Sequence, residues 1–490
     1  MLHQHRSQAR RSYTKRRRHR RTVLIIGVLA VCILAFGLSQ LYLHTWGDAK
    51  SPVLLDGQPL VLNTAPKQTD DTFLLPAREI LETLGCSVSQ DAESGGFTAD
   101  HQGRIISFQA GQNTALVNRR TIQLSSPILE ENGTAFLPSD FLESAVGAAV
   151  QLSEDGKTLS ITSPKPRETL QDITVPDTYR LTGERATYNG VTIIDGVGME
   201  LLHVSDEQAV QYADIINAIA ASLPESVNCY NLLVPTMAEF YAPAELYPNY
   251  TQFMRTVYSN LELNVTPVDL ITPLLQHAAE PIFFTTDHHW TQRGAYYAYE
   301  AYLKHTGGQI DPLDTFENQP AEDYRGSLVN FTSGTAGASL LGSDRLERFL
   351  PKVEVTGTAY SDAQMTQPFR SLKLVDTDLT TYECFIEGDV PVAVFQTGTK
   401  NGKKLAVIKE SYGNAFVTWA VNNYEEIYVI DFREFNGDNA PSGSMKIADF
   451  YDLTQFDDLV IISYPVSVAS VKHRQALAGF AEVPPAEENN

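Results

Sequence analysis

The sequence predicts an α/β layered domain with a mostly parallel sheet, preceded by a duplicated α+β domain and one N-terminal transmembrane helix. Residues 186–475 alternate short apolar strands with helical stretches, an order typical of α/β layers. Residues 51–163 contain an internal repeat, and residues 22–43 carry no charged side chain. At 490 residues the chain is too long for one hydrophobic core, so a division into domains is expected.

The N-terminal residues have the pattern of a membrane anchor. Residues 1–21 hold nine Lys and Arg and no acidic residue, and the apolar segment 22–43 follows directly. At about 1.5 Å per helical residue, this segment can cross a hydrocarbon core of about 30 Å. The positive cluster predicts a cytoplasmic tail at 1–21 and a single-pass cell-membrane protein whose bulk is extracytoplasmic. A cleaved signal peptide is the alternative, but no small-x-small cleavage site follows the apolar run.

Charge and cysteine content exclude several classes of protein. The net charge of −22 becomes −31 once the nine positive residues of the N-terminal tail are set aside. Such an acidic ectodomain argues against non-specific binding of nucleic acid. The cysteines are widely spaced and form no CxxC pair, which excludes a disulfide scaffold and a zinc site built on such pairs: Cys32, Cys86, Cys229 and Cys384.

The region 51–163 repeats with a period of 62 residues. Its two copies place Pro76 against Pro138 and Gly85 against Gly147. Each copy predicts a strand, a turn and a strand, then a short helix near the proline and a closing hairpin. The region resembles the copper-amine-oxidase-N-terminal-like domains used as extracytoplasmic stalks in Gram-positive envelope proteins, which implies a rigid spacer. A copper site is not expected, because His101 is the one histidine of the region.

The remainder of the chain divides into three parts. The Pro-rich, polar segment 164–185 predicts a linker. Within the domain of residues 186–475, the stretch 310–400 is irregular and rich in Gly, Ser, Thr and Asp. It predicts an insertion with a few strands that roofs a site. Residues 476–490 predict a disordered acidic tail.

Asp287, His288, His289 and Trp290 are consecutive and come just before a helix with an apolar, aromatic side. Imidazole is the side chain best suited to moving protons near neutral pH. A carboxylate two residues away can fix the tautomer of the ring and stabilise its charged form. The tetrad therefore predicts half of a catalytic site, which needs a nucleophile from elsewhere.

Ser411 is the candidate nucleophile. It follows the apolar strand KLAVIK and opens the next helix, and ligands of parallel α/β sheets bind at the carboxyl ends of strands. Backbone N–H groups at such a helix start can stabilise an oxyanion, and Asn414 adds a side-chain amide donor. The alternative role for Ser411 is that of a helix cap.

The stretch TDHHWTQRGAYYAY, followed far downstream by KESYGNAFVTWA, resembles the DHHW family. More distantly, it resembles the SGNH-hydrolase-like domains of alginate O-acetylation proteins. The resemblance implies Ser411 as the nucleophile, His289 as its base and Asp287 as the residue that orients His289. His288 has no counterpart in the Asp-x-His-Trp pattern, which implies a packing role. Glu410 departs from the family pattern, which has Asp before the serine.

The resemblance covers about residues 190–470 and implies an SGNH-like fold. It implies a serine O-acyltransferase or esterase, with acetyl as the acyl group, acting on a cell-surface polysaccharide without a cofactor. It also implies a membrane-bound acyl-donor protein as partner. Further candidates for contact with the substrate or the oxyanion are Asn414, Tyr412, Trp290 and Arg433. Arg433 is expected either to bind an anionic sugar, to orient Asp287 or to lie on the surface.

Two other functions fit the same residues. Asp287, His288 and His289 are possible ligands of a metal-dependent hydrolase, but adjacent histidines on a rigid element point apart. No HExxH motif or second dense His/Asp cluster supplies further ligands. The other function is that of a non-catalytic envelope scaffold that binds polysaccharide. Ester hydrolysis by the wild type and by Ser411→Ala separates this scaffold from an enzyme.

Overall fold

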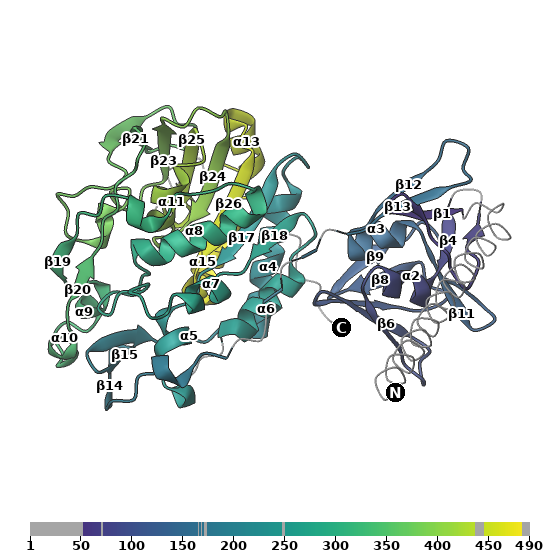
Figure 1. Cartoon of the computed structure of the whole chain (residues 1–490), viewed down its shortest axis with the longest axis horizontal. Coiled ribbons are helices and arrows are strands. Elements are labelled where there is room, and N and C mark those ends of the chain that lie inside the picture. Colours follow the sequence, from purple (N-terminus) through teal and green to yellow (C-terminus); the bar gives the residue numbers. More distant parts are fainter. Residues whose placement is uncertain are drawn as a thin grey trace, which may run out of the picture. The chain divides into compact units, whose positions relative to one another are not determined.

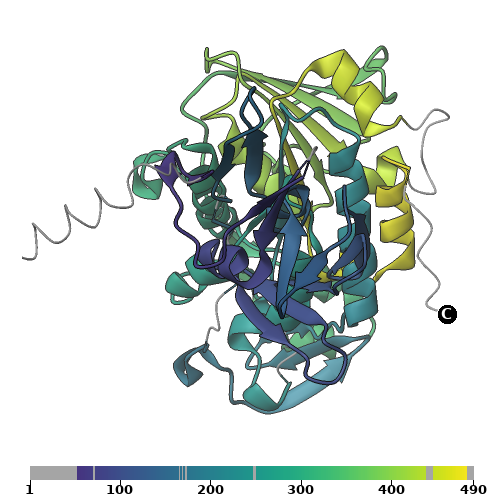
Figure 2. The same ribbon diagram turned by 90° about the vertical axis from the view of Figure 1, so that its right-hand side faces the viewer.

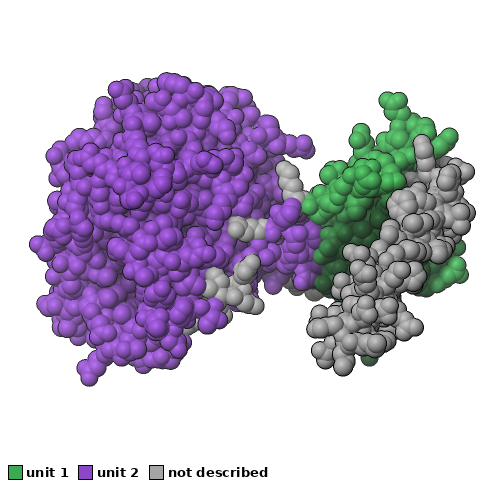
Figure 3. All heavy atoms as spheres, in the orientation of Figure 1, with its two compact units in different colours: residues 1–99, 107–116, 121–165 green, residues 100–106, 117–120, 166–490 purple. Residues whose placement is uncertain are grey.

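The computed structural model describes residues 52–69, 72–164, 166–167, 169–170, 174–246, 250–436 and 445–482. The predicted cytoplasmic tail 1–21 and transmembrane helix 22–43 lie outside these residues. None of the helices in the described ranges is both long and apolar enough to span a membrane. The chain forms two compact units (Figure 3). Among the described residues, the first holds 52–69, 72–99, 107–116 and 121–164, and the second holds the others.

The predicted repeat is visible in the order of the elements. Each element of the first copy except its last strand recurs about 62 residues later in the second. The first copy contains β1 (Val53–Leu55), β2 (Gln58–Pro59), β3 (Lys67–Gln68), β4 (Phe73–Pro76), α2 (Ala77–Thr83), β5 (Ser87–Gln90), β6 (Phe97–His101) and β7 (Arg104–Phe108). The second contains β8 (Thr114–Val117), β9 (Arg120–Gln123), β10 (Leu129–Glu131), β11 (Thr134–Pro138), α3 (Asp140–Val146), β12 (Ala149–Leu152) and β13 (Leu159–Thr162).

The two copies interlock and share one core. β4 of the first copy pairs antiparallel with β11 of the second, so that Leu75 faces Leu137. β1 pairs in parallel with β13. The side chains of Ile80 and Phe141, one from the helix of each copy, are completely buried. Neither copy could bury its apolar face alone, which is why the repeat folds as a pair.

The second unit is built on an eight-stranded sheet with the order β18-β17-β26-β24-β25-β23-β21-β22 (Figure 1). The five strands from β18 to β25 in this order are parallel, and the last three join antiparallel. The strands are β17 (Asn228–Leu233), β18 (Val265–Val268), β21 (Val355–Tyr360), β22 (Pro368–Leu372), β23 (Val392–Thr397), β24 (Lys404–Lys409), β25 (Glu426–Asp431) and β26 (Asp458–Ser463).

The prediction of a mostly parallel sheet is therefore correct for only part of this sheet, and antiparallel pairings predominate over the described residues as a whole. The three antiparallel strands β21, β22 and β23 come from the stretch 310–400, which was expected to lie over a site as an insertion. No long helix connects them, and strands joined without a helical crossover pair antiparallel. These three strands extend the main sheet, whereas other residues of the stretch, among them Tyr324, Tyr382 and Asp389, line the cavity over Ser411.

Helices flank the main sheet on both sides (Figures 1 and 2). Every residue of β26 is buried, as expected for a strand covered on both faces. α8 (Gln292–Thr306) lies against α11 (Tyr412–Ala420), and α4 (Asp206–Ala221) lies against α6 (Tyr250–Asn260) and α15 (Val471–Ala478). The predicted tail begins too early, because residues 476–478 complete α15 and Leu477 is fully buried. Residues 483–490 lie outside the described part.

Shorter elements complete the second unit, including the antiparallel sheet β14-β15-β16 and the two-stranded antiparallel sheet β19-β20. They are β14 (Arg185–Tyr188), β15 (Val191–Ile194), β16 (Val197–Glu200), α5 (Met237–Tyr241), α7 (Ile271–Gln276), β19 (Ala321–Tyr324), α9 (Ser327–Phe331), α10 (Gly337–Leu340), β20 (Asp344–Leu346), α12 (Phe432–Phe435), α13 (Ile447–Thr454) and α14 (Pro465–Ala469). Short 3₁₀ turns cover Asp177–Tyr179, Ala244–Leu246, Leu313–Thr315 and Tyr382–Cys384.

Candidate active site

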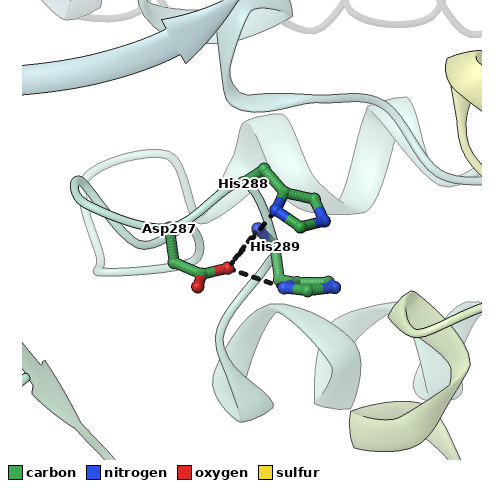
Figure 4. Close-up of side chains that lie close together, drawn as sticks. All are labelled: Asp287, His288 and His289. Atoms are coloured by element: carbon green, nitrogen blue, oxygen red, sulfur yellow. Dashed lines mark hydrogen bonds and ion pairs between the residues drawn. The ribbon is translucent and has the colours of Figure 1, made fainter. Parts of the chain in front are cut away.

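Ser411, His289 and Asp287 form a hydrogen-bonded series at the carboxyl end of β24. His289 Nε2 lies 2.7 Å from Ser411 Oγ, and His289 Nδ1 lies 2.6 Å from Asp287 Oδ1 (Figure 4). Because the carboxylate accepts a hydrogen bond from the N–H at Nδ1, Nε2 carries no proton and is free to accept the hydroxyl proton of Ser411. The exposed fractions of His289 and Asp287 are 5% and 3%, whereas Ser411 is partly exposed. Within this series, the serine is the member that solvent reaches.

The turn between β24 and α11 presents the hydroxyl of Ser411. Ser411 occupies the position before the first residue of α11, yet its backbone is already helical and its side chain makes no capping bond. The cap role considered for Ser411 is therefore not the one that its hydroxyl adopts. A Cβ added at Gly413 would lie 2.4 Å from Lys409 Cβ, so the close turn requires glycine there.

The first backbone N–H groups of α11 are already engaged. Tyr412 N–H donates to Glu410 Oε2 over 3.0 Å and Gly413 N–H donates to Glu410 O over 2.8 Å, while Asn414 N–H donates to Ser411 O. Burial raises the pKa of Glu410 to about 7, against the opposing effect of Arg433. The start of α11 was expected to supply backbone N–H donors to an oxyanion. Its first three N–H groups instead form hydrogen bonds within the turn. Asn414 is among the residues that line the cavity with Ser411.

Four donors hold the carboxylate of Asp287. Two come from His289, its ring Nδ1 and its backbone N–H, and the others are Tyr324 OH and Ser327 N–H, each at 2.7 Å. Burial alone would raise the pKa of Asp287, but the charge and hydrogen bonds of His289 outweigh it and hold the pKa well below its usual range. A Cβ added at Gly326 would lie 2.3 Å from the Asp287 side chain. Asp287 is thus held ionised in a closely fitted position.

Two reciprocal hydrogen bonds join the tetrad to the nucleophile turn. The indole N–H of Trp290 donates to the carbonyl of Tyr412 over 2.9 Å, and Tyr412 OH donates to the carbonyl of His288. Trp290 and Tyr412 are completely buried and do not line the cavity. The sequence suggested both residues as substrate contacts. They instead hold the tetrad against the turn that carries Ser411.

The strand-like segment before the tetrad is anchored by Asp344, which the sequence did not single out. Its carboxylate accepts from the backbone N–H and the hydroxyl of both Thr285 and Thr286, over 2.6–2.8 Å. Four donors on one carboxylate fix the path of the chain into Asp287. No local signal marks Asp344, because it lies 57 residues beyond Asp287 in an irregular part of the sequence.

His288 bonds Ser327, whereas His289 bonds Ser411. The Nδ1 of His288 lies 2.5 Å from Ser327 Oγ, and its ring centroid lies 3.8 Å from that of His289. Burial, with the charge of His289, lowers the pKa of His288 to about 3, so this ring is neutral. The possible ligand atoms of Asp287, His288 and His289 lie within 4.8 Å of one another (Figure 4). A metal ion on His289 would have to displace either Asp287 or Ser411.

Arg433 lies in a charge network behind the nucleophile, not beside Asp287. Its guanidinium bonds Asp431 and Asp389, each at 2.7 Å, and Lys409 Nζ contacts the same two carboxylates at 2.8 and 2.7 Å. Lys409 and Asp431 are buried, and such charges are retained only when they are paired. The expectation that Arg433 orients Asp287 is wrong, because two nearer carboxylates take its donors.

A cavity of about 340 Å³ opens over Ser411. The ring of Tyr382 forms one side and stacks on the imidazole of His289, with centroids 3.8 Å apart and planes 4° apart. The cavity is lined by Asp287, His289, Ser411 and Asn414, by the segment Tyr324–Ser327 with Asn330, and by Thr381, Tyr382, Glu383, Gly388 and Asp389. Tyr324, Tyr382 and Asp389 were missed from the sequence, because the stretch that holds them has no periodic pattern.

Comparisons with known proteins follow the same division of the chain. Residues 172–430 match the DHHW protein family, and residues 54–161 match the copper amine oxidase N-terminal domain. No curated protein matches the chain. A DHHW family protein from Eubacterium siraeum is 27% identical, with a TM-score of 0.54 over 61% of this chain and 97% of that one.

Two further solved structures are more distant. Bacillus cereus PatB1 with a sulfonyl adduct is 17% identical, with a TM-score of 0.46 over 60% of this chain and 98% of that one. The O-acetyltransferase domain of Pseudomonas putida AlgJ is 17% identical, with a TM-score of 0.34 over 59% and 96%. The match to residues 172–430 covers more than half of the chain and includes both the tetrad and Ser411. The chain therefore belongs to the DHHW family.

Proposed function

We propose that the chain is a serine O-acyltransferase or esterase that carries an acyl group on Ser411. The observation that supports this most strongly is the series Ser411–His289–Asp287, with bonds of 2.7 and 2.6 Å and the serine facing the cavity. A serine hydroxyl is a weak nucleophile until an adjacent base takes its proton. His289 and the ionised Asp287 provide such a base and its orienting partner.

The reaction has two halves. In the first, Ser411 Oγ attacks the carbonyl carbon of an acyl ester while His289 Nε2 takes the hydroxyl proton. The tetrahedral intermediate collapses, His289 returns the proton to the departing alcohol, and an acyl ester remains on Ser411. In the second, His289 takes a proton from an acceptor hydroxyl or from water, which attacks the acyl ester. The products are an O-acyl acceptor or a free acid, together with regenerated Ser411.

The size and polarity of the cavity support a small acyl group and a hydroxylated acceptor. A volume of about 340 Å³ suits an acetyl group and part of one sugar better than a long acyl chain. Polar side chains on its rim, among them Asn330 and Thr381, can bond sugar hydroxyls. We propose acetyl and a cell-surface polysaccharide. A transmembrane helix at residues 22–43, as the sequence predicts, would hold the protein at the cell membrane beside a membrane-bound acyl-donor protein.

The proposal is tested with p-nitrophenyl acetate and the full-length chain in detergent. Ser411→Ala is expected to abolish turnover above background, and His289→Ala to lower it about 10²–10⁴-fold. A serine-reactive phosphonate is expected to label the wild type and not Ser411→Ala. His277→Ala is the control, since His277 pairs with Glu280 outside the cavity. Equal turnover by wild type and Ser411→Ala would contradict the enzyme and favour a glycan-binding scaffold.

A further inference from the structure

The loop of residues 381–389 has an unusual backbone where it reaches the nucleophile. Ile386, Glu387 and Gly388 have consecutive φ angles of 51°, 52° and 86°. A β-branched residue such as Ile386 rarely adopts positive φ. Such conformations persist only where the surrounding structure over-determines them, and they cluster at functional sites. The turn they form delivers Asp389 to the wall of the cavity.

The carboxylate of Asp389 is tied to both flanks of Ser411. Its Oδ1 accepts from Lys409 Nζ at 2.7 Å and from Asn414 Nδ2 at 3.0 Å, and its Oδ2 accepts from Arg433 at 2.7 Å. Lys409 comes two residues before the serine and Asn414 comes three residues after it. Burial would raise the pKa of Asp389, but the charges of Lys409 and Arg433 hold it well below its usual range. The carboxylate is ionised and its charge is balanced.

Asp389 also decides which way the amide of Asn414 points. Asn414 has an exposed fraction of 2%, and among the described residues no hydrogen-bond partner faces its Oδ1. Leaving a buried carbonyl oxygen without a partner is unfavourable. Turning the amide over would place this oxygen against the carboxylate of Asp389, which is less favourable still. The nitrogen of the amide is therefore held toward Asp389.

We propose that Asp389 is a positioning residue that holds the Asn414 amide as an oxyanion donor. The amide nitrogen carries two N–H bonds, of which Asp389 takes one. The other is available to the oxyanion formed on the acyl carbon, since the N–H groups of Tyr412, Gly413 and Asn414 serve the turn. Lys409 and Arg433 balance the charge of Asp389, so that it does not repel the oxyanion. This inference rests on the proposed serine acyl transfer.

A double-mutant cycle on p-nitrophenyl acetate turnover tests the role. Asn414→Ala is expected to lower kcat about 10²-fold, the usual effect of removing one oxyanion donor. Asp389→Asn is expected to lower kcat about 10-fold with KM little changed, and Asp389→Glu to recover part of it. In the double variant, Asp389→Asn should lower kcat by less than about twofold further, because both residues act through one donor. Asp378→Asn, an exposed acid paired with Lys373, is the control.

Additive losses in the double variant would overturn the positioning role. A crystal structure of Asp389→Ala, which removes the acceptor altogether, gives a readout that does not depend on turnover, and the Asn414 side chain is expected to leave its present position. An unchanged Asn414 side chain would overturn the inference even if the enzyme is active. Wild-type protein without Ser411-dependent turnover would contradict the proposed function, and with it the oxyanion role. If Asp389→Asn does not fold, Asp389→Glu replaces it in the cycle.

Discussion

The two units treat charged side chains in opposite ways. Among the described residues of the first unit no acidic or basic side chain is buried, and its ion pairs lie at the surface, as between Arg78 and Glu82. Arg104 of β7, which is 1% exposed, is counted with the second unit. The second unit buries Asp287, Lys409 and Asp431 to exposed fractions of 3% or less. Buried charges add little stability compared with apolar side chains of similar size. Their concentration around Ser411 agrees with the proposal that this unit carries the chemistry.

The loss of stability on removing one buried charge should show the difference between the two units most clearly. Lys409→Met removes one of the two cations that Asp389 and Asp431 share and leaves them with Arg433, and is expected to lower the free energy of unfolding of the second unit by about 3–5 kcal/mol. Arg78→Ala removes a surface pair and is expected to change stability by less than about 1 kcal/mol. Urea unfolding followed by tryptophan fluorescence reports the second unit, which holds Trp290 and Trp419, and far-UV circular dichroism also follows the first unit, which holds Arg78. Similar losses in both variants would remove the contrast between the units.

A methyl group at Gly326 tests how closely Asp287 is fitted. The added Cβ would overlap the Asp287 side chain and displace it from His289. Gly326→Ala is expected to lower turnover about 10²-fold, the effect of a misplacement on the order of 1 Å. Gly342→Ala, whose Cβ would meet its nearest neighbour at 3.8 Å, should leave turnover unchanged. An active Gly326→Ala enzyme would show that Asp287 has room to move.

The pH dependence of stability should show the burial of Glu410. Because burial raises its folded pKa to about 7, the folded state binds this proton more tightly than the unfolded state does. Its contribution favours folding below about pH 4.5 and is lost as the pH rises through 7. The free energy of unfolding of Glu410→Gln, relative to that of the wild type, should therefore rise by on the order of 1–3 kcal/mol between pH 5 and pH 8. Thermal unfolding of both proteins at pH 5 and at pH 8 measures this change. A difference in stability between them that does not depend on pH would contradict a raised pKa of Glu410.

Several features could be predicted because their signals are local. The tetrad occupies four consecutive residues, and the serine follows directly on a run of apolar strand residues. The repeat is visible because its two copies keep the same spacing. Arg433 shows the limit, since a sequence reveals a charged side chain near a strand end but not which carboxylate lies nearest. Its partner Asp389 lies 44 residues earlier, in a loop without a regular pattern.

The sequence by itself determined the tetrad, the nucleophile candidate, the repeated domain and the alternation of strands and helices. Each of these depends on residues that are near one another along the chain. Only the tertiary structure decided that β21, β22 and β23 extend the sheet antiparallel, and that Tyr382 and Asp389 reach the serine. Strand pairing and loop closure depend on contacts between distant segments, and a segment's own residues do not specify its neighbour. The residues that surround the triad, such as Tyr382 and Asp389, could therefore be identified only from the tertiary structure.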